Sequence, residues 1–131
     1  MRRNAIVVIS LAAAMAFIQA PARSAESIAL KSGETTEIGP EYWVANCRSI
    51  LKGAMTVEIL EGPPDVAASI REQDVLPRKQ NCARPVPGGV LVLTAKEIKA
   101  QIQTKLILRV KYPTADGERQ KSRNIDLTLL P

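Results

Sequence analysis

The side chains that could do chemistry are two cysteines, two pairs of acids and two groups of bases, and the chain has no histidine. Without histidine, neither a Ser-His-Asp nor a Cys-His catalytic site can be built. Paired carboxylates can serve as general acid and general base. Two pairs are close in sequence: Glu58 with Glu61, and Glu72 with Asp74. Their strand and turn positions are typical of solvated surface charges, so we expect a protein that is not an enzyme.

Cys47 and Cys82 are the only cysteines, and a bond between them would close a loop of about 35 residues. A redox pair typically has C-x-x-C spacing, and a structural zinc site needs four ligands from Cys and His. In an oxidising compartment, two distant cysteines most simply form one structural disulfide. We therefore expect a disulfide, no metal and no cofactor.

The basic residues form two groups that could contact an anion or a partner. One lies in the loop around the second cysteine, and the other on one face of a predicted strand: Arg78, Lys79 and Arg84, and then Lys105, Arg109 and Lys111. The loop group could hold a carboxylate, a phosphate or an anionic envelope polymer. The alternatives are a solvated loop and the charges that commonly protect sheet edges from aggregation. Lys121 and Arg123 lie near the tip of the same predicted hairpin, on its other face.

The overall charge argues against nucleic acid as a partner. The formal net charge is +5, from 18 Lys and Arg against 13 Asp and Glu, and loss of Arg2 and Arg3 with a leader leaves +3. Nucleic-acid binding is typically marked by a clustered basic stripe and stacking aromatic residues. The chain has one Trp, two Tyr and one Phe. Tyr42 and Trp43 are adjacent, which would suit a sugar-stacking platform or, more simply, core packing.

The first residues have the pattern of a secretory signal peptide. Two arginines follow Met1, and the apolar stretch Ala5–Ile18 is shorter than the roughly 20 residues that a membrane-spanning helix needs. Ala20–Ala22 fits the A-x-A cleavage motif. We expect a helical signal peptide over residues 1–22, with cleavage as late as residue 25 or an uncleaved anchor as alternatives. The mature chain would be periplasmic or secreted, with no permanent membrane span.

The elements that position these residues are predicted to be strands. Short runs of Val, Ile, Leu and Thr, separated by Pro and Gly, indicate one all-β domain over residues 23–131. The predicted strands cover residues 27–31, 35–38, 42–50, 56–61, 66–71, 89–94, 104–112 and 119–130. In the third of these, Trp43, Ala45 and Cys47 would share one face, and Gly39-Pro40 would break the second. Residues 77–89 read as a long loop fastened by the disulfide.

Two local signals are more specific. Thr94-Ala-Lys-Glu97 fits the capping box and predicts a short helix over residues 95–102, with a loop or irregular strand as the alternative. Thr114-Ala-Asp-Gly117 is a hairpin turn signal between the last two strands. With Asp116-Gly117 as the turn residues, Leu108 faces Ile125. One face of that hairpin is then apolar toward the chain end and polar near the tip.

Taken together, about seven strands, one disulfide and a C-terminal hairpin resemble an immunoglobulin-like antiparallel β-sandwich. Five segments also resemble small exported bacterial proteins with no assigned activity: Asn46–Ser49, Leu60–Pro64, Gln80–Cys82, Arg109–Tyr112 and Asp116-Gly117. The chain departs from true immunoglobulin domains because Trp43 precedes the first cysteine and Gln80 stands where a tyrosine corner would have Tyr. The disulfide is therefore free to tie loops together.

A fold of this kind does not determine function. We expect an exported, non-catalytic binding or structural module of the bacterial envelope, whose partner is a protein or an anionic envelope polymer. Loops at one end, or an open sheet edge that accepts a partner strand, would do the binding. The alternatives are an inhibitor of a secreted enzyme, which would present the loop around Cys82, and a carboxylate-based hydrolase.

Overall fold

The computed structural model describes residues 26–131 and is built of β-strands with one 3-10 turn. The predicted signal peptide and its cleavage site lie outside the described residues. The strands are β1 Glu26–Lys31, β2 Thr35–Glu41, β3 Val44–Ala45, β4 Arg48–Ser49, β5 Thr56–Glu61, β6 Val66–Val75, β7 Val86–Ala95, β8 Ile102–Thr114 and β9 Gly117–Leu130, and the 3-10 turn η1 is Arg78–Gln80. The all-β prediction is confirmed. From Glu26 onward, no helix has the length and apolar character needed to cross a membrane.

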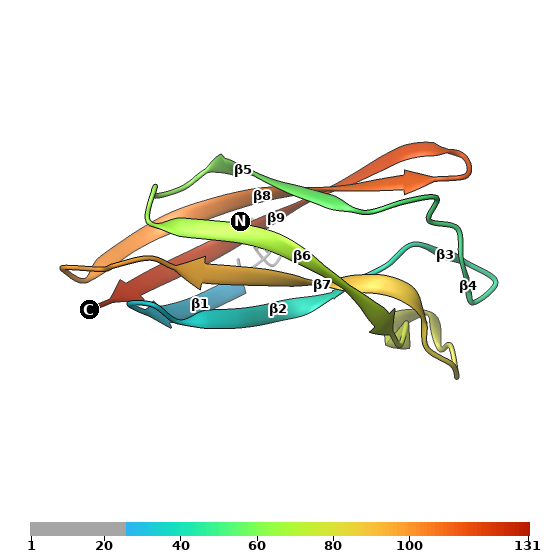
Figure 1. Ribbon diagram of the computed structural model, residues 1–131, viewed down its shortest axis with the longest axis horizontal. Coiled ribbons are helices and arrows are strands. Elements are labelled where there is room, and N and C mark those ends of the chain that lie inside the picture. The colour runs from blue at the N-terminus through green and yellow to red at the C-terminus, as the bar shows by residue number, and fades with distance from the viewer. Residues whose placement is uncertain (1–25) are drawn as a thin grey trace, which may run out of the picture.

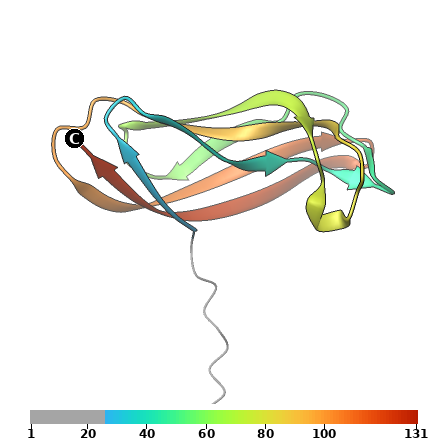
Figure 2. The same cartoon turned by 90° about the horizontal axis from the view of Figure 1, so that it is seen from below.

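Two sheets pack face to face as a sandwich (Figures 1 and 2). One sheet has the strand order β1-β9-β8-β5 and the other β2-β7-β6, while β3 and β4 form a small separate hairpin. The remaining pairs in residues 26–131 are antiparallel, but β1 runs parallel to β9. The prediction of a wholly antiparallel sandwich is therefore wrong at β1. The chain passes from one sheet to the other between β1 and β2.

The core follows from strand alternation, because successive side chains of a strand point to opposite faces. The inward residues of the three central strands are almost completely buried: Leu91 and Leu93, then Leu106, Leu108 and Val110, then Ile125, Leu127 and Leu129. Strand β7 is buried on both faces, as its unbroken apolar run predicted. Its other face carries Val90 and Val92, which form a smaller cluster with Val75 and the partly buried Tyr42.

The C-terminal hairpin has the predicted faces but a different turn. Its turn residues are Ala115 and Asp116, because Thr114 pairs with Gly117. The Thr114 hydroxyl donates to the Gly117 carbonyl at 2.5 Å and accepts from the Asp116 N–H at 3.2 Å, which fixes this turn. Leu108 therefore faces Arg123 and not Ile125. A shift of two residues keeps every side chain on its predicted face, since the strand period is two.

The short helix predicted over residues 95–102 is wrong. Thr94 and Ala95 end strand β7, and residues 96–101 form a loop without regular secondary structure that leads to β8. The Ala95 N–H donates to the carbonyl of Glu34 at 2.9 Å, and the Thr94 hydroxyl hydrogen-bonds that of Thr35 at 3.0 Å. Pairing with β2 thus keeps Thr94 in strand conformation and gives its hydroxyl a partner in Thr35. Ile98, which the predicted helix would have contained, is buried in the core.

The strand predicted over residues 42–50 is replaced by the β3–β4 hairpin. Asn46 and Cys47 occupy its turn with φ of 51° and 59°, the left-handed conformation that a two-residue hairpin turn requires. Trp43, Ala45 and Cys47 consequently do not share one strand face. The predicted disulfide is confirmed: Cys47 bonds to Cys82, which lies just after η1, with the Cα atoms 5.5 Å apart. It ties two loops together at one end of the sandwich.

Loss of this disulfide should destabilise the domain through its unfolded state. Replacing both Cys47 and Cys82 by Ser removes a crosslink that closes a loop of 35 residues, and we expect the free energy of unfolding to fall by up to about 4 kcal/mol. Urea denaturation of the oxidised protein and the double variant measures the difference. Reduced and alkylated wild type is the control and should show the same loss. Equal stability of all three samples would contradict the prediction.

Candidate functional site

A groove of about 930 Å³ lies on one flank of the sandwich, where the edge of β2 faces the first half of β9. Its walls are the second half of β2 with Tyr42, the end of β6, the turn η1 and residues 121–123 of β9. Figure 2 shows the loop that carries η1 projecting beside the end of β2. Val90 and Tyr112 contribute from the central strands. The groove therefore gathers segments that are far apart in the sequence.

The groove lies where the inner face of β9 changes from charged to apolar, about halfway along the strand. β1 pairs only with residues 125–130 of β9, so within the described chain residues 117–124 have no partner on the side opposite β8. The core-facing positions of the second half are Ile125, Leu127 and Leu129, and those of the first half are Arg119, Lys121 and Arg123. This is the apolar-to-polar change that the sequence predicted for the hairpin.

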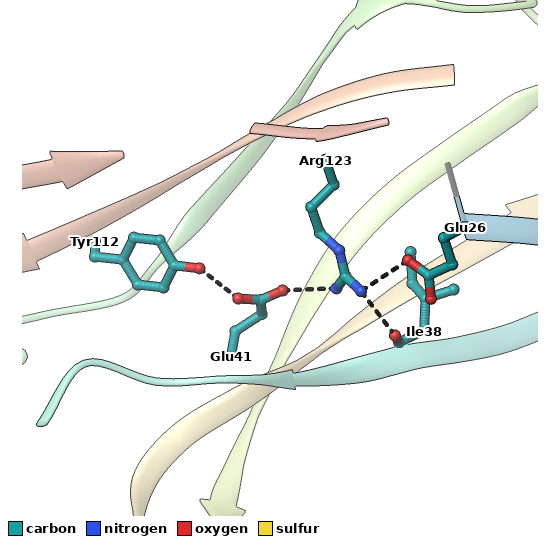
Figure 3. Close-up of polar contacts among 5 residues, drawn as sticks. All are labelled: Glu26, Ile38, Glu41, Tyr112 and Arg123. Atoms are coloured by element: carbon teal, nitrogen blue, oxygen red, sulfur yellow. Dashed lines mark hydrogen bonds and ion pairs between the residues drawn. The ribbon is translucent and has the colours of Figure 1, made fainter. Parts of the chain in front are cut away.

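Arg123 joins the two sheets across this flank (Figure 3). Its Nη1 donates to Oε1 of Glu41 at 2.9 Å, and its Nη2 donates to Oε2 of Glu26 at 2.9 Å and to the carbonyl oxygen of Ile38 at 3.2 Å. The hydroxyl of Tyr112 donates to the other carboxylate oxygen of Glu41. One guanidinium on β9 is thus bonded to β1 and twice to β2.

A β-bulge in β2 makes one of these contacts available. The sequence predicted that β2 would end before Gly39-Pro40, but the strand continues to Glu41 with a shift in register between Glu37 and Gly39. Gly39 has φ of 141°, which L side chains rarely adopt, and proline is tolerated at bulges and on edge strands. Ile38 is left out of the pairing with β7, and its carbonyl accepts from Arg123.

The carboxylate of Glu41 is almost buried, with 9% of its side chain exposed against 26% for Arg123. Burial of a charge is costly unless ion pairing and hydrogen bonds compensate it. Both oxygens of Glu41 have such a partner, Arg123 on one side and Tyr112 on the other. Burial raises the pKa of Tyr112 far above its ordinary value, and its hydrogen bond to Glu41 raises it further. Tyr112 therefore stays a protonated donor to the carboxylate.

Trp43 and Lys121 pack beside Tyr112, on the solvent side of the cluster formed by Glu41, Arg123 and Tyr112. The rings of Trp43 and Tyr112 have centroids 5.2 Å apart, and Nζ of Lys121 lies 5.0 Å from the centroid of Trp43. Trp43 is half-buried against the main core. A cation over an aromatic face is attracted by the ring quadrupole. The indole thus packs against the core beneath a lysine, as the core-packing alternative expects.

The groove brings together part of the predicted basic residues and adds others. Arg78 and Lys79 line it, whereas Arg84 does not. Lys105, Arg109 and Lys111 lie on the outer face of β8, away from the core. There Glu58 forms ion pairs with Arg109 at 3.2 Å and with Lys111 at 3.8 Å. The two predicted groups therefore belong to different surfaces.

The charge balance of the groove favours an anionic ligand. Its lining holds four cationic side chains and three acidic ones: Arg78, Lys79, Lys121 and Arg123, and then Glu37, Glu41 and Asp74. Glu37 pairs with Arg71, and Glu41 pairs with Arg123. No acidic side chain between Glu26 and Pro131 lies within ion-pair distance of Arg78, Lys79 or Lys121. Among the described residues, three cations of the groove lining are thus outside any ion pair, against one acid, Asp74.

The carboxylate pairs suggested by the sequence lie on strands at sheet edges. Glu58 and Glu61 belong to β5, and Glu72 and Asp74 belong to β6; all four are exposed. Glu58 is held in ion pairs by its neighbours on β8. In the part of the chain that the structure describes, no three acids or cysteines are grouped as metal ligands would be.

The sequence could have shown part of what the groove contains. Alternation places Arg119, Lys121 and Arg123 on the same face of β9 as its buried residues, and charges at core-facing positions indicate that the face is uncovered there. Glu41 and Tyr112 carried no such signal. Glu41 lies beyond the expected end of its strand, and its contact with Tyr112 joins residues 71 positions apart.

Removal of Arg123 should leave Glu41 buried without its counter-ion. We expect Arg123→Met to lower the free energy of unfolding by about 3 kcal/mol, because breaking a buried ion pair leaves an uncompensated charge. The double variant Arg123→Met/Glu41→Gln removes that charge and keeps an acceptor for Tyr112, so it should lose less than the single variant. Urea denaturation followed by the fluorescence of the single Trp measures both. A double variant at least as unstable as Arg123→Met would refute this role.

Tyr112 should make stability fall at high pH. The pKa of Tyr112 is raised in the folded state, so its contribution is complete below the unfolded value of about 10 and is lost as the pH rises above it. The unfolded chain then releases a proton that the folded chain keeps, which costs about 1.4 kcal/mol per pH unit. Tyr112→Phe should give a shallower decline of unfolding free energy between about pH 9 and pH 11. Equal slopes for both proteins would show that Tyr112 ionises normally.

Comparison of the chain with protein-family models, with curated proteins and with solved structures found no match. Any proposal for what the groove binds therefore rests on the geometry and charge of the groove itself. Its defining features are an ion pair that closes the flank, a set of cations for which the described part of the chain offers no acidic partner, and two strand edges that face each other across it.

Proposed function

We propose that the chain is an exported, non-catalytic binding module of the bacterial envelope, and that the groove between β2 and β9 is its binding site. The observation that carries this proposal is the set of cations along the groove that have no acidic partner within residues 26–131, Arg78, Lys79 and Lys121. Their ligand is an anionic partner, either a protein or an envelope polymer. Charged groups at such a site steer the encounter and select the partner.

Two features support export to an oxidising compartment, periplasmic or extracellular. The sequence of residues 1–22 has the charge, apolar length and small-residue motif of a secretory leader. The bond between Cys47 and Cys82 is of a type that persists in oxidising compartments and is rare in the cytosol. Both features favour the same location.

The strand order supports an immunoglobulin-like fold. In such a sandwich the second, fifth and fourth strands are neighbours in one sheet, and the third, sixth and seventh in the other. Here β2-β7-β6 corresponds to the first set and β9-β8-β5 to the second, with β1 added beside β9. This order favours kinship with the small exported bacterial proteins of that fold. Their resemblance extends over residues 27–131.

The groove chemistry supports binding more than catalysis. The most buried acid of the groove, Glu41, has each oxygen held by a partner and so stabilises the flank. A general acid or base must be free to exchange a proton with a substrate. The exposed cations are suited to holding an anion by charge-assisted hydrogen bonds.

Charge reversal in the groove should abolish capture of the partner. The mature, oxidised protein is immobilised, exposed to bacterial envelope extract and eluted with salt, and the eluate is analysed by mass spectrometry. The variant Arg78→Glu/Lys79→Glu should lose the captured partner because it reverses two groove cations. The matched control Lys96→Glu/Lys99→Glu changes the net charge equally in the β7–β8 connection and should retain the partner. Equal capture by both variants, or none by the wild type, would contradict the proposal.

A further inference from the structure

We infer that the partner presents an extended acidic segment, which adds as a strand to the free edge of β9 along the groove. This inference rests on the proposed function, because it names the chemistry of the partner for the same groove. The ligand class is a peptide in extended conformation with acidic side chains at alternate positions.

The edge available to such a strand is the first half of β9. β1 leaves β9 at the pair Glu26–Ile125, and among the described residues nothing pairs with residues 117–124 on the side opposite β8. An unpaired strand edge presents backbone N–H and carbonyl groups that can bond to an added strand. Main-chain bonds of this kind give affinity, and the side-chain positions give selectivity.

The side chains along this edge set a charge pattern. Arg119, Lys121 and Arg123 lie at every second position of β9 and therefore on one face, with successive members about 7 Å apart. A neighbouring strand has the same spacing, so acids at alternate positions would each lie beside one of these cations. Opposite charges directly across two strands stabilise their pairing.

Glu26 forms a related, diagonal contact within the chain, because it is in register with Ile125 and its carboxylate reaches Arg123. It is the first residue of β1, the strand beside β9, and its carboxylate meets Arg123 at 2.9 Å. Beyond Glu26 along the same edge lie Lys121 and Arg119, for which no acid between residues 26 and 131 is within ion-pair distance. The sequence before Glu26 contains no Asp or Glu. An acidic segment of a partner would continue the pattern.

The opposite rim of the groove also suits an acidic segment. Arg78 and Lys79 of η1 are exposed and line the groove together with Lys121. An extended peptide on the edge of β9 would therefore have cations beside it on β9 and across from it on η1. A polymer without amide groups would meet the same charges but could not form the main-chain bonds of strand addition.

The probe is a capped nine-residue peptide in which Glu and Thr alternate. Three controls accompany it: a peptide of the same composition with its glutamates grouped, and two N-methylated forms of the alternating peptide, one methylated on its glutamates and the other on its threonines. Calorimetry gives the affinities, and amide hydrogen exchange by NMR locates the contact. We expect the alternating peptide to bind about fivefold or more tightly than the grouped peptide and than the N-methylated form whose methyl groups face β9, and to protect amides of residues 118–124. The other N-methylated form should keep its affinity.

Variants of the protein test the charge pattern. Arg119 is exposed, so Arg119→Glu should fold normally and weaken the alternating peptide about fivefold or more. Lys99→Glu, an equal change of charge at the opposite end of the sandwich, should leave the affinity unchanged. A peptide with Lys in place of the glutamate that faces residue 119 should regain affinity for Arg119→Glu.

The outcomes separate this inference from the proposed function. Equal binding of the grouped and N-methylated peptides, without protection of β9, would overturn strand addition and leave a groove that recognises charge alone. Failure of the alternating peptide to bind at millimolar concentration would also overturn it. If the groove variant Arg78→Glu/Lys79→Glu also captured as much from envelope extract as the wild type, the proposed function would fall as well.

Discussion

The ion pair between Arg123 and Glu41 is the contact on which the open flank of this sandwich depends. A sandwich is normally closed by apolar side chains from both sheets, but the first half of β9 carries cations on its inner face. Arg123 replaces apolar packing there by bonding to β2 through Glu41 and Ile38, and to β1 through Glu26. The two sheets are thus fastened by one guanidinium at the place where the apolar core ends.

This arrangement explains why stability and binding can share the same flank. Arg123 and Glu41 neutralise each other in the interior, and Tyr112 satisfies the remaining carboxylate oxygen. The cations farther out, Lys121 and those of η1, do not take part in that pairing and stay on the surface of the groove. The disulfide anchors the end of the loop that carries η1 to the β3–β4 turn, so it limits how far that rim can move.

Local patterns predicted the elements well where strand alternation was unbroken. The faces of the C-terminal hairpin, the doubly buried run in β7 and the disulfide all follow from residue type and spacing. Two predictions from local patterns are wrong. At Thr94, where a capping box predicted a helix, long-range pairing with β2 decides the conformation. Around Cys47, where a strand was predicted, the chain forms a hairpin turn that is bonded to Cys82. The parallel pairing of β1 with β9 joins the two ends of the described chain, and no local pattern encodes it. The same holds for the site: Arg78 and Lys79 were identified from their loop, but Glu41 required knowledge of the bulge in β2.

The most direct measurement of the central claim is native-state amide hydrogen exchange on the mature, oxidised protein without ligand. If Arg123 fastens the flank and leaves the edge of β9 free, amides of residues 118–124 that point away from β8 should exchange rapidly. Those of residues 125–129 should be slow throughout, because β8 and β1 flank them on both sides. Uniform protection from residue 118 to residue 130 would show that another segment already covers the edge, and it would contradict the account.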